Sequence, residues 1–442
     1  MNNLQQDIRD LVSKHYTELN GVKKFIPNKT FIPATTKSID ENEVRALVES
    51  ALKFEITDGE VTKKFEVEMA RYCKTRYATF CNSGSSANLL AFMSLTSPKL
   101  GSRAIRSGDE VITCAVGFPT TVAPIIQAGC IPVYLDVTLG TYNVTPSMVS
   151  DAITEKTKAI FLAHTLGNPF DVKAIKEIAI QNNLWLIEDC ADALGGMFDG
   201  NPVGTYGDIS TTSFFPAHMI TTGEGGMVFT DNSMLNQIIR SMRDWGRDCW
   251  CKPGNDNTCG KRFDWKDKGG LPDGFDHKYV YSHVGYNLKS TDLQAAIGLE
   301  QLKKLPLFVT TRQHNWNKLC DDFYKYGLDS YFILPSHYSN SNPSWFGFAL
   351  TIRDNVGFTR SSIVQYLESS KIGTRNLFGG NLTKQPGFMK IGRIADEMAG
   401  SLPKADIVMN KTFWIGVHPK VTDEMIDYMV ASVYEFVLEK AI

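Results

Sequence analysis

The sequence predicts an α/β fold with a mostly parallel central sheet flanked by helices, followed by a smaller C-terminal α+β domain. Apolar runs of strand length alternate with amphipathic helical stretches from about residue 59 to about residue 302. After residue 303 this alternation gives way to helical stretches and short strands such as "WFGFALTI". The 442 residues also exceed the roughly 250 to 300 at which a single core stops growing, so two domains are expected.

The elements are expected in a definite order along the chain. Residues 1–50 form a helical arm that leads into an extended segment, and residues 51–302 form the large domain. The stretches "PSMVSDAI" and "VKAIKEIAIQNN" have helical periodicity and would cover its sheet. An irregular insertion rich in Gly, Lys and Asp spans residues 248–281, and long loops of this kind are usually functional or disordered. Residues 303–442 form the small domain. The strands of the large domain are expected in "DEVITCAV", "CIPVYLDV", "KAIFLAHT", "LWLIEDCADALGG", "ISTTSFF" and "GGMVFT".

Composition and charge narrow the class of protein. A net charge of −2 with both signs scattered offers no basic patch for nucleic acid or a membrane surface, so small molecules or proteins are the expected partners. No run approaches the ~20 apolar residues of a spanning helix, and the polar start "MNNLQQDIRDLVSKHYTELN" does not have the pattern of a signal peptide. We therefore expect a cytoplasmic protein. In that setting nine cysteines favour reduced thiols or metal ligands over disulfides.

Two segments have the composition of ligand sites. In "NSGSSANLLAFMSL" a Gly/Ser turn opens directly into an apolar helical run, and a helix start offers backbone N–H groups and a positive dipole end to a phosphate. An ordinary Ser-rich helix cap would give the same pattern. The buried run "LWLIEDCADALGG" places Glu188 and Asp189 at a strand end, where ligands bind in open α/β sheets. A carboxylate there can keep a pyridinium nitrogen protonated, although Asp189 could also cap the next helix.

The order of six motifs then points to a family. The stretches "NSGSSAN", "GFPTT", "EDCADALGG", "SFFPAH", "GEGGMVFT" and "GYNLKSTDLQAAIG" resemble the DegT/DnrJ/EryC1 family of sugar aminotransferases and dehydratases that depend on pyridoxal phosphate (PLP). The resemblance runs from about residue 30 to the C-terminus and implies fold type I of the PLP-dependent transferases, that of aspartate aminotransferase. It also implies a homodimer in which Asn287 reaches the phosphate of the neighbouring subunit. The other cofactor-binding residues that it implies are Ser85, Ser86 and Ser213 at the phosphate, Phe118 stacked on the ring, Asp189 at the pyridine nitrogen, Gly84 and His164 beside the cofactor, and Asp192, where many relatives have a glutamine near the 3-hydroxyl.

His218 falls where this family has the lysine that binds the cofactor covalently. Lysine lets transamination turn over, and histidine cannot replace it in that role. An imidazole can still act as an acid or a base at neutral pH. The resemblance therefore narrows to sugar-nucleotide 3-dehydratases, which hold pyridoxamine phosphate (PMP) noncovalently, with His218 as the catalytic group for C3 dehydration of a nucleotide-linked 4-keto-6-deoxyhexose. The alternative is a polar core residue in a protein that has lost catalysis.

The insertion carries a cysteine motif. The stretch "RDWGRDCWCKPGNDNTCGKRF" places Cys249, Cys251 and Cys259 as C-x-C-x7-C. Four thiolates hold a [2Fe-2S] cluster, so three local cysteines are one short, and a zinc site or unligated thiols are alternatives. The motif resembles the branch of 3-dehydratases that acts on CDP-4-keto-6-deoxyglucose, on the path to 3,6-dideoxyhexoses, where an upstream cysteine completes the cluster.

The position of that fourth ligand departs from the pattern. Ala191 stands at the matching position, and the available thiol is its neighbour Cys190, which is predicted to complete the cluster. A shift of one residue at a strand end turns a side chain toward the other face, so Cys190 would need local rearrangement. His277 and His283, in the same region, are candidate substitute ligands.

The resemblance also implies a partner and leaves two rival functions open. In that branch a separate NADH-dependent reductase with flavin and iron-sulfur centres delivers two electrons singly through the cluster, giving a 3-deoxy sugar. One rival is an iron-independent GDP-sugar 3-dehydratase of the colitose type, which regenerates PMP with glutamate. The C-x-C motif argues against that enzyme, and Ala191 argues partly for it. The other rival is a catalytically silent binding protein with the aminotransferase fold.

Overall fold

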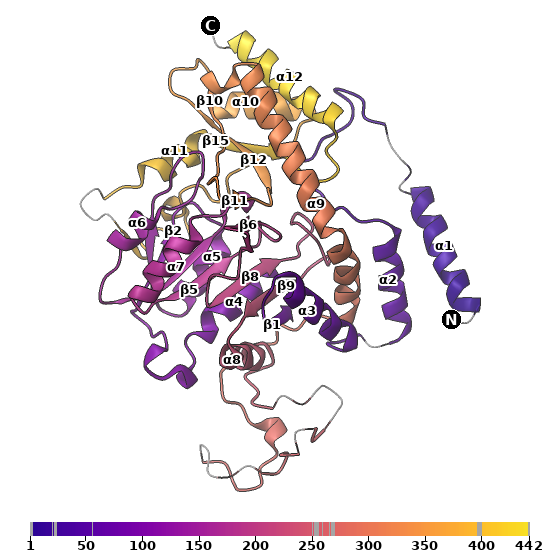
Figure 1. Ribbon diagram of the computed structural model, residues 1–442, viewed down its shortest axis with the longest axis vertical. Helices are drawn as coiled ribbons and strands as arrows, with labels where there is room; N and C mark the ends of the chain where they lie inside the picture. The colour runs from indigo at the N-terminus through magenta and orange to yellow at the C-terminus, as the bar shows by residue number, and fades with distance from the viewer. Residues whose placement is uncertain are drawn as a thin grey trace.

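A computed structural model of the protein describes residues 3–440 except 20, 22–23, 55, 250, 252–255, 259, 265, 267–269 and 396–399. A sheet of eight strands lies at the centre of the large domain, in the order β1-β9-β8-β5-β4-β2-β3-β14 (Figure 1). Neighbouring strands from β8 to β14 pair in parallel, whereas β9 runs antiparallel to β1 and β8. The predicted α/β fold with a mostly parallel sheet is confirmed.

The strands of this sheet include all the apolar runs that the sequence analysis singled out. Two further strands were not predicted: β1, and the two-residue β14, which comes from the C-terminal part of the chain and is too short to show a periodicity. The strands are β1 Tyr77–Cys81, β2 Glu110–Cys114, β3 Ile131–Leu135, β4 Thr157–Ala163, β5 Trp185–Asp189, β8 Ile209–Ser213, β9 Gly226–Thr230 and β14 Arg393–Ile394.

Helices cover both faces of the sheet because successive side chains of a strand point to opposite sides. Phe161 of β4 packs in one apolar cluster with residues of α4, α5 and α8. Its neighbours Ile160 and Leu162 pack in another cluster with residues of α6 and α7. The helices of the large domain are α3 Glu60–Tyr72, α4 Gly84–Ser94, α5 Pro119–Gln127, α6 Pro146–Asp151, α7 Val172–Gln181 and α8 Ser233–Arg243, with 3-10 turns at Pro98–Arg103 and Thr165–Gly167.

The small domain has an antiparallel sheet in the order β10-β12-β15-β13. One long helix, α9 Asp292–Lys325, crosses the boundary predicted at residue 302 without a break and joins the two domains (Figure 1). The N-terminal arm contains α1 Asn3–Leu19 and α2 Glu41–Leu52. The remaining elements are β10 Phe332–Ile333, β12 Gly347–Ile352, β13 Thr374–Asn376, β15 Thr412–Gly416, α10 Arg360–Ser369, α11 Pro403–Lys411 and α12 Asp423–Lys440, the small sheet of β6 Met197–Phe198, β7 Asn201–Pro202 and β11 Ser341–Asn342, and 3-10 turns at Leu328–Ser330 and Leu382–Lys384.

The insertion of residues 248–281 extends away from the body beyond α8 (Figure 1). In its described part the one regular element is the 3-10 turn His277–Tyr279, as expected for an irregular segment. Polar contacts hold its stem. The carboxylate of Asp248 accepts hydrogen bonds from Lys99 Nζ and Ser282 Oγ, both at 2.9 Å. The insertion therefore starts from a fixed base beside the large domain.

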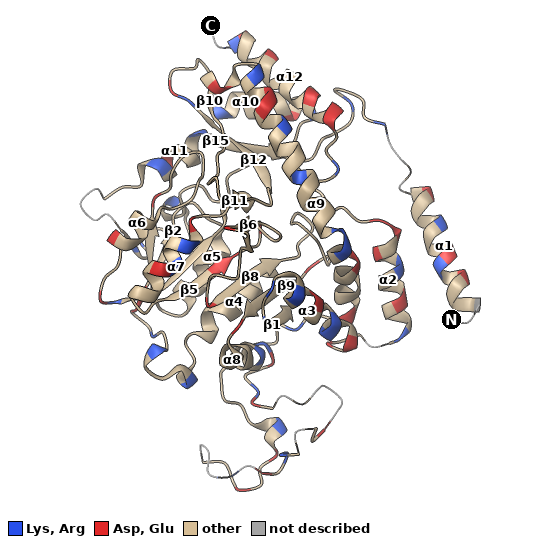
Figure 2. Ribbon diagram, in the orientation of Figure 1, with Lys and Arg blue, Asp and Glu red and all other residues tan. Residues whose placement is uncertain are grey.

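The distribution of charge matches the small net charge of the sequence. Lysine and arginine residues are interspersed with aspartate and glutamate along α1 and α9, whereas α12 is mostly acidic (Figure 2). Among the described residues, no helix combines the length and the apolar character that crossing a bilayer requires.

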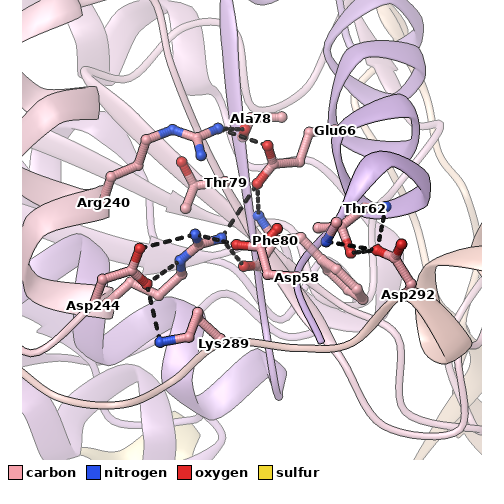
Figure 3. Close-up of polar contacts among 12 residues, drawn as sticks. Asp58, Thr62, Glu66, Ala78, Thr79, Phe80, Arg240, Asp244, Lys289 and Asp292 are labelled. Carbon is pink, nitrogen blue, oxygen red and sulfur yellow. Dashed lines mark hydrogen bonds and ion pairs between the residues drawn. The ribbon is translucent and has the colours of Figure 1, made fainter. Parts of the chain in front are cut away.

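A buried ion-pair network joins segments that are far apart in the sequence (Figure 3). Arg243, at the end of α8, is 2% exposed. Its guanidinium contacts three carboxylates: Asp58 at 2.6 Å, Asp244 at 2.9 Å and Glu66 at 3.4 Å. It also donates to the carbonyl oxygen of Phe80 in β1 at 2.9 Å. Three acidic groups around one buried cation favour its charged form and raise the pKa of Arg243 above its ordinary value.

The network also positions the turn that precedes α4. The N–H of Leu288 donates to the carbonyl oxygen of Arg243 at 3.0 Å, and the N–H of Asn82 donates to that of Leu288 at 2.9 Å. Lys289 lies 3.8 Å from Asp244 and over the ring of Trp245, at 3.4 Å from its centroid. The segment "GYNLKSTD" is thereby fixed between α8 and the first turn of α4.

Candidate active site

A cavity of about 720 Å³ opens at the carboxyl ends of β4, β5 and β8, where ligands bind in open α/β sheets. Residues of the small domain close its other side, Arg375, Asn376 and Trp414 among them. Most of the side chains singled out in the sequence analysis meet here. The predicted residues that line it are Gly84, Ser85, Phe118, His164, Asp189, Asp192, Ser213 and His218.

One corner of the cavity has the features of a phosphate site. Ser83 caps α4, accepting from the N–H of Ser86 at 3.1 Å, while Gly84 and Ser85 line the cavity at the positive end of the helix. A Cβ on Gly84 would lie 2.4 Å from the Cβ of Ser213, so glycine is what lets the end of β8 approach this helix start. Ser86 is not among the lining residues, because its hydroxyl lies 3.0 Å from Ser83 Oγ.

Asp189 is held from three sides at the end of β5. Its Oδ2 accepts from Asn88 Nδ2 at 2.8 Å and from Thr121 Oγ1 at 2.7 Å, and its Oδ1 accepts from the N–H of Ala191 at 3.0 Å. Thr211 Oγ1 in turn donates to Asn88 Oδ1 at 2.6 Å. Three donors fix the carboxylate as an acceptor, the form that binds a protonated pyridine nitrogen.

Asn88 and Thr121 are functional residues that the sequence analysis missed. Both stand inside motifs that it quoted, "NSGSSAN" and "GFPTT". Asn88 lies one helical turn after Gly84, which could have suggested that it faces the same ligand. Arg375 and Asn376 were also missed, and they gave no signal because they reach the cavity from a strand of the other domain.

His218 follows β8 and faces the cavity with its side chain 17% exposed. Its Nδ1 lies 3.2 Å from Oδ1 of Asp192, at ion-pair distance but outside hydrogen-bond geometry. The rings of Phe346 and Phe215 lie 5.3 and 6.5 Å from the imidazole, centroid to centroid. Burial raises the pKa of Asp192, and the neighbouring imidazole opposes this shift. No lysine is among the described residues that line the cavity.

His164 is buried behind the cofactor site. Its Nε2 lies 3.1 Å from Glu188 Oε2, and its ring stacks on Phe170 with centroids 4.3 Å apart. Glu188 also accepts backbone N–H groups of Gly204, Tyr206 and Gly207 at 2.8, 2.9 and 2.6 Å. The Sγ of Cys190 is near both groups. Because hydrogen bonds already occupy the Glu188 oxygens, this trio does not fit a metal ion.

Cys190 and the described cysteines of the insertion line different cavities. Cys190 is 4% exposed and lines an apolar cavity of about 210 Å³ that is distinct from the active-site cavity. Ala191, one residue later, lines the active-site cavity itself, as the alternation of side chains at a strand end requires. Burial raises the pKa of the Cys190 thiol well above its ordinary value.

The remaining predicted ligands lie in or beside the insertion. Cys249 and Cys251 line one small cavity together with His277, and the N–H of Cys251 donates to Cys249 Sγ at 3.5 Å. Cys259 lies outside the described residues. The substitute ligand His283 is held elsewhere, with Nε2 2.7 Å from Ser97 Oγ and Nδ1 2.9 Å from Ser241 Oγ.

Asn287 is exposed on the surface and does not line the cavity of its own chain. Phe118 does line it, with 53% of its surface exposed. Its ring packs edge to face with that of Phe378, and the two ring centroids are 6.4 Å apart. An exposed aromatic face at the cavity mouth is available for stacking on a planar ligand.

Comparison with known proteins identifies the family. Residues 37–434 match the DegT/DnrJ/EryC1/StrS aminotransferase family. The chain is 54% identical over 418 residues to a dTDP-4-dehydro-2,6-dideoxy-D-glucose 3-dehydratase of Saccharopolyspora spinosa, covering 94% of this chain and 89% of that protein. It is 49% identical over 438 residues to the lipopolysaccharide biosynthesis protein RfbH of Salmonella typhimurium, covering 98% of each chain.

A solved structure has the same architecture. The E. coli GDP-4-keto-6-deoxy-D-mannose-3-dehydratase with bound hydrated PLP superposes with a TM-score of 0.81 at 29% identity, covering 91% of this chain and 99% of that one. These matches cover nearly the whole chain, so they account for most of its fold. The chain therefore belongs to the DegT/DnrJ/EryC1/StrS aminotransferase family.

Proposed function

We propose that the protein is a PMP-dependent sugar-nucleotide 3-dehydratase that removes the C3 hydroxyl of a nucleotide-linked 4-keto-6-deoxyhexose. The observation that carries the proposal is His218, which faces the cavity from the position of the family's covalent lysine with Asp192 beside its Nδ1. The relatives named as 3-dehydratases support the reaction class.

The cavity fits the cofactor. Gly84, Ser85 and Ser213 would hold the phosphate, Asp189 the pyridine nitrogen, and Phe118 one face of the ring. When bound, PMP supplies an amine that joins the C4 ketone of the sugar and a ring that accepts electrons. At the rim, Arg375 is exposed and places a cation where the phosphates of a nucleotide sugar would enter.

His218 is the proton carrier in this proposal. With Nδ1 3.2 Å from the carboxylate of Asp192, Nε2 is the nitrogen proposed to exchange protons with a ligand. It removes a proton from the C4′ carbon of the cofactor and delivers one to the departing C3 hydroxyl, which leaves as water. The rings of Phe215 and Phe346 keep solvent from the imidazole during this transfer.

Noncovalent binding of the cofactor gives a direct test. The protein loaded with PLP and treated with borohydride is expected to carry no pyridoxyl group, because no described lysine lines the cavity. In His218→Lys the same treatment should attach one pyridoxyl group at residue 218, as intact-mass and peptide mass spectrometry would show. A pyridoxyl group on any lysine of the unaltered chain would contradict the proposal.

For the electron source we propose an iron-sulfur site in the insertion, built by Cys249, Cys251 and Cys259 with His277 as the fourth ligand. The support is that Cys249, Cys251 and His277 line one cavity, and that histidine replaces cysteine on one iron of Rieske-type [2Fe-2S] clusters. Because His277 Nε2 lies 3.2 Å from Asp248 Oδ2, His277 would bind iron through Nδ1 or give up this contact. Bound there, a cluster would supply single-electron transfer from an NADH-dependent flavin and iron-sulfur reductase. Conversion of the dehydrated sugar to a 3-deoxy product would need two such electrons and two protons.

Iron and sulfide analysis of anaerobically purified protein tests this site. We expect about two iron and two sulfide ions per chain, lost in Cys251→Ser and weakened in His277→Ala. Protein without iron that forms 3-deoxy product with glutamate would contradict the site and favour the second candidate, the iron-independent 3-dehydratase. That candidate is supported by Ala191, which lines the cavity where the family's fourth cysteine is expected.

We also propose a homodimer. Asn287 is exposed next to Asp244, with which it forms a β-bridge, so it is presented on a rigid segment rather than on a loose loop. The exposed side chains of Tyr279, Tyr281 and Val284 lie close to it in the chain and supply apolar surface for a partner. In such a dimer Asn287 would reach the phosphate in the other subunit.

A further inference from the structure

Arg312 is a buried cation without an obvious role. It lies on α9 and is 1% exposed, among the largest fully buried side chains of the protein. Burial lowers its pKa to about 10, which still leaves it charged at neutral pH. A buried charge is costly unless its surroundings compensate it, so its retention calls for an explanation.

Its hydrogen bonds go to the backbone that precedes β12. The Nη1 of Arg312 donates to the carbonyl oxygen of Trp345 at 3.1 Å and lies 3.5 Å from that of Phe346. Its Nε has no hydrogen-bond partner among the described residues. Two carbonyl dipoles alone compensate a full charge poorly, so a carboxylate is needed as well.

Asp192 is the carboxylate whose charge acts on Arg312, and it also lies beside His218. The other titratable neighbour, His418, adds no balancing negative charge. Burial and Arg312 together hold the pKa of His418 at about 4, so its ring is neutral, with Nε2 2.9 Å from the carbonyl oxygen of Pro33. The group that offsets the positive charge of Arg312 is therefore the carboxylate of Asp192, which lines the active-site cavity.

The backbone that Arg312 holds also carries the ring next to His218. The N–H of Phe346 donates to the carbonyl oxygen of Leu166 at 2.8 Å, and Arg312 holds the carbonyl groups beside it. The Phe346 ring lies 5.3 Å from the imidazole of His218 and 5.4 Å from Trp414, centroid to centroid. Arg312 thus acts, through the backbone, on Phe346, whose ring is a neighbour of the imidazole.

We propose that Arg312 is a positioning residue for His218: it anchors the backbone that presents the Phe346 ring to the imidazole. The inference rests on the proposed function for its catalytic consequence, but its structural part stands on the chain alone. If Arg312 had only a structural role, it would hold α9 to the small domain, and its replacement would not move the imidazole of His218.

The test compares Arg312→Met, Arg312→Lys and Asn315→Ala in the full-length protein. Asn315 is the matched control, because it is buried on the same helix and its Nδ2 donates to backbone carbonyls of Val417, His418 and Val421 without contacting Phe346. The first readout is the Cε1–H resonance of His218 in histidine-labelled protein without substrate, assigned with His218→Asn. The exposed His314, also on α9, reports distortion of the helix.

We expect Arg312→Met to move the His218 resonance and leave that of His314 in place, and Arg312→Lys to restore part of the shift. In turnover, kcat should fall by between about 10- and 100-fold with KM changed little, because a misplaced catalytic group costs rate rather than binding. Asn315→Ala should lose about as much stability as Arg312→Met. Its His218 resonance and its kcat should stay those of the wild type.

An unmoved His218 resonance in Arg312→Met, or a kcat equal to that of Asn315→Ala, would overturn the proposal. Should the methionine variant fail to fold, Arg312→Gln, which keeps a donor for the carbonyl groups but no charge, is measured against the same two outcomes. Wild-type protein without dehydratase activity would overturn the proposed function instead, and the resonance would still decide the role of Arg312.

Discussion

Replacing His218 with asparagine is expected to lower the rate of dehydration by about 10²- to 10⁴-fold, the range typical for removal of a general acid or base. Asparagine is close in size and polarity, so the packing between Phe215 and Phe346 should persist. What the variant loses is the imidazole that is proposed to carry the proton. Steady-state kinetics with PMP and substrate measures the loss.

A binding measurement separates chemistry from folding in this experiment. Affinity for PLP, followed by its absorbance, should stay within a few-fold of the wild type, because Ser85, Asp189 and Ser213 are untouched. His314→Asn is the control, since His314 is exposed and pairs with Asp423 at 2.8 Å on the surface. Full activity in His218→Asn would mean that another group carries the proton.

Replacing Arg243 with methionine is expected to destabilise the protein by roughly 3 to 5 kcal/mol at pH 7, the usual result of removing one partner of a buried ion pair. The side chain is 3% exposed, and its loss leaves Asp58, Glu66 and Asp244 facing one another around an apolar group (Figure 3). Denaturant unfolding of wild type and variant measures the difference.

The penalty should also depend on pH in a defined direction. Burial already raises the pKa of Asp58 above its ordinary value, and Arg243 opposes this shift, so loss of the cation should raise that pKa further. Such a group stabilises the fold below its unfolded pKa, and that stability is lost as pH rises through the folded pKa. The deficit of Arg243→Met should therefore be small near pH 4 and full at pH 7.

Arg240→Met is the matched control for this network. Arg240 pairs with Glu66 at 2.6 Å, but its side chain is 39% exposed, so its removal should cost no more than about 1 kcal/mol. Equal losses in the two variants, or a deficit that does not change with pH, would show that burial of Arg243 is not what makes the network important.

Local patterns were sufficient to predict the fold. The run Trp185–Asp189 is apolar up to its acidic end because β5 is buried on both faces, and the turn at Gly84 is followed at once by a helix. Local sequence patterns could not predict which distant segments lie close together. The contact between Asp192 and His218 depends on how β5 and β8 end, and Arg375 enters from a strand of the other domain.

The neighbours Cys190 and Ala191 show the same limit. A shift of one residue decides whether a side chain points into the active site or into the core behind it, and the structure gives the inward position to Ala191. The boundary predicted at residue 302 lies inside α9 for a related reason, because a helix that serves two cores has no interruption in its sequence where the domains meet.

The central claim, loss of the C3 hydroxyl with PMP as cofactor, is tested most directly by isotope release. The protein is incubated with PMP and either the dTDP- or the CDP-linked 4-keto-6-deoxyhexose, each carrying ¹⁸O at C3, and the sugar nucleotide is analysed by mass spectrometry. The account predicts loss of ¹⁸O to water from at least one substrate, dependent on PMP and at least about 100-fold slower in His218→Asn. Full retention of ¹⁸O in both substrates would contradict it.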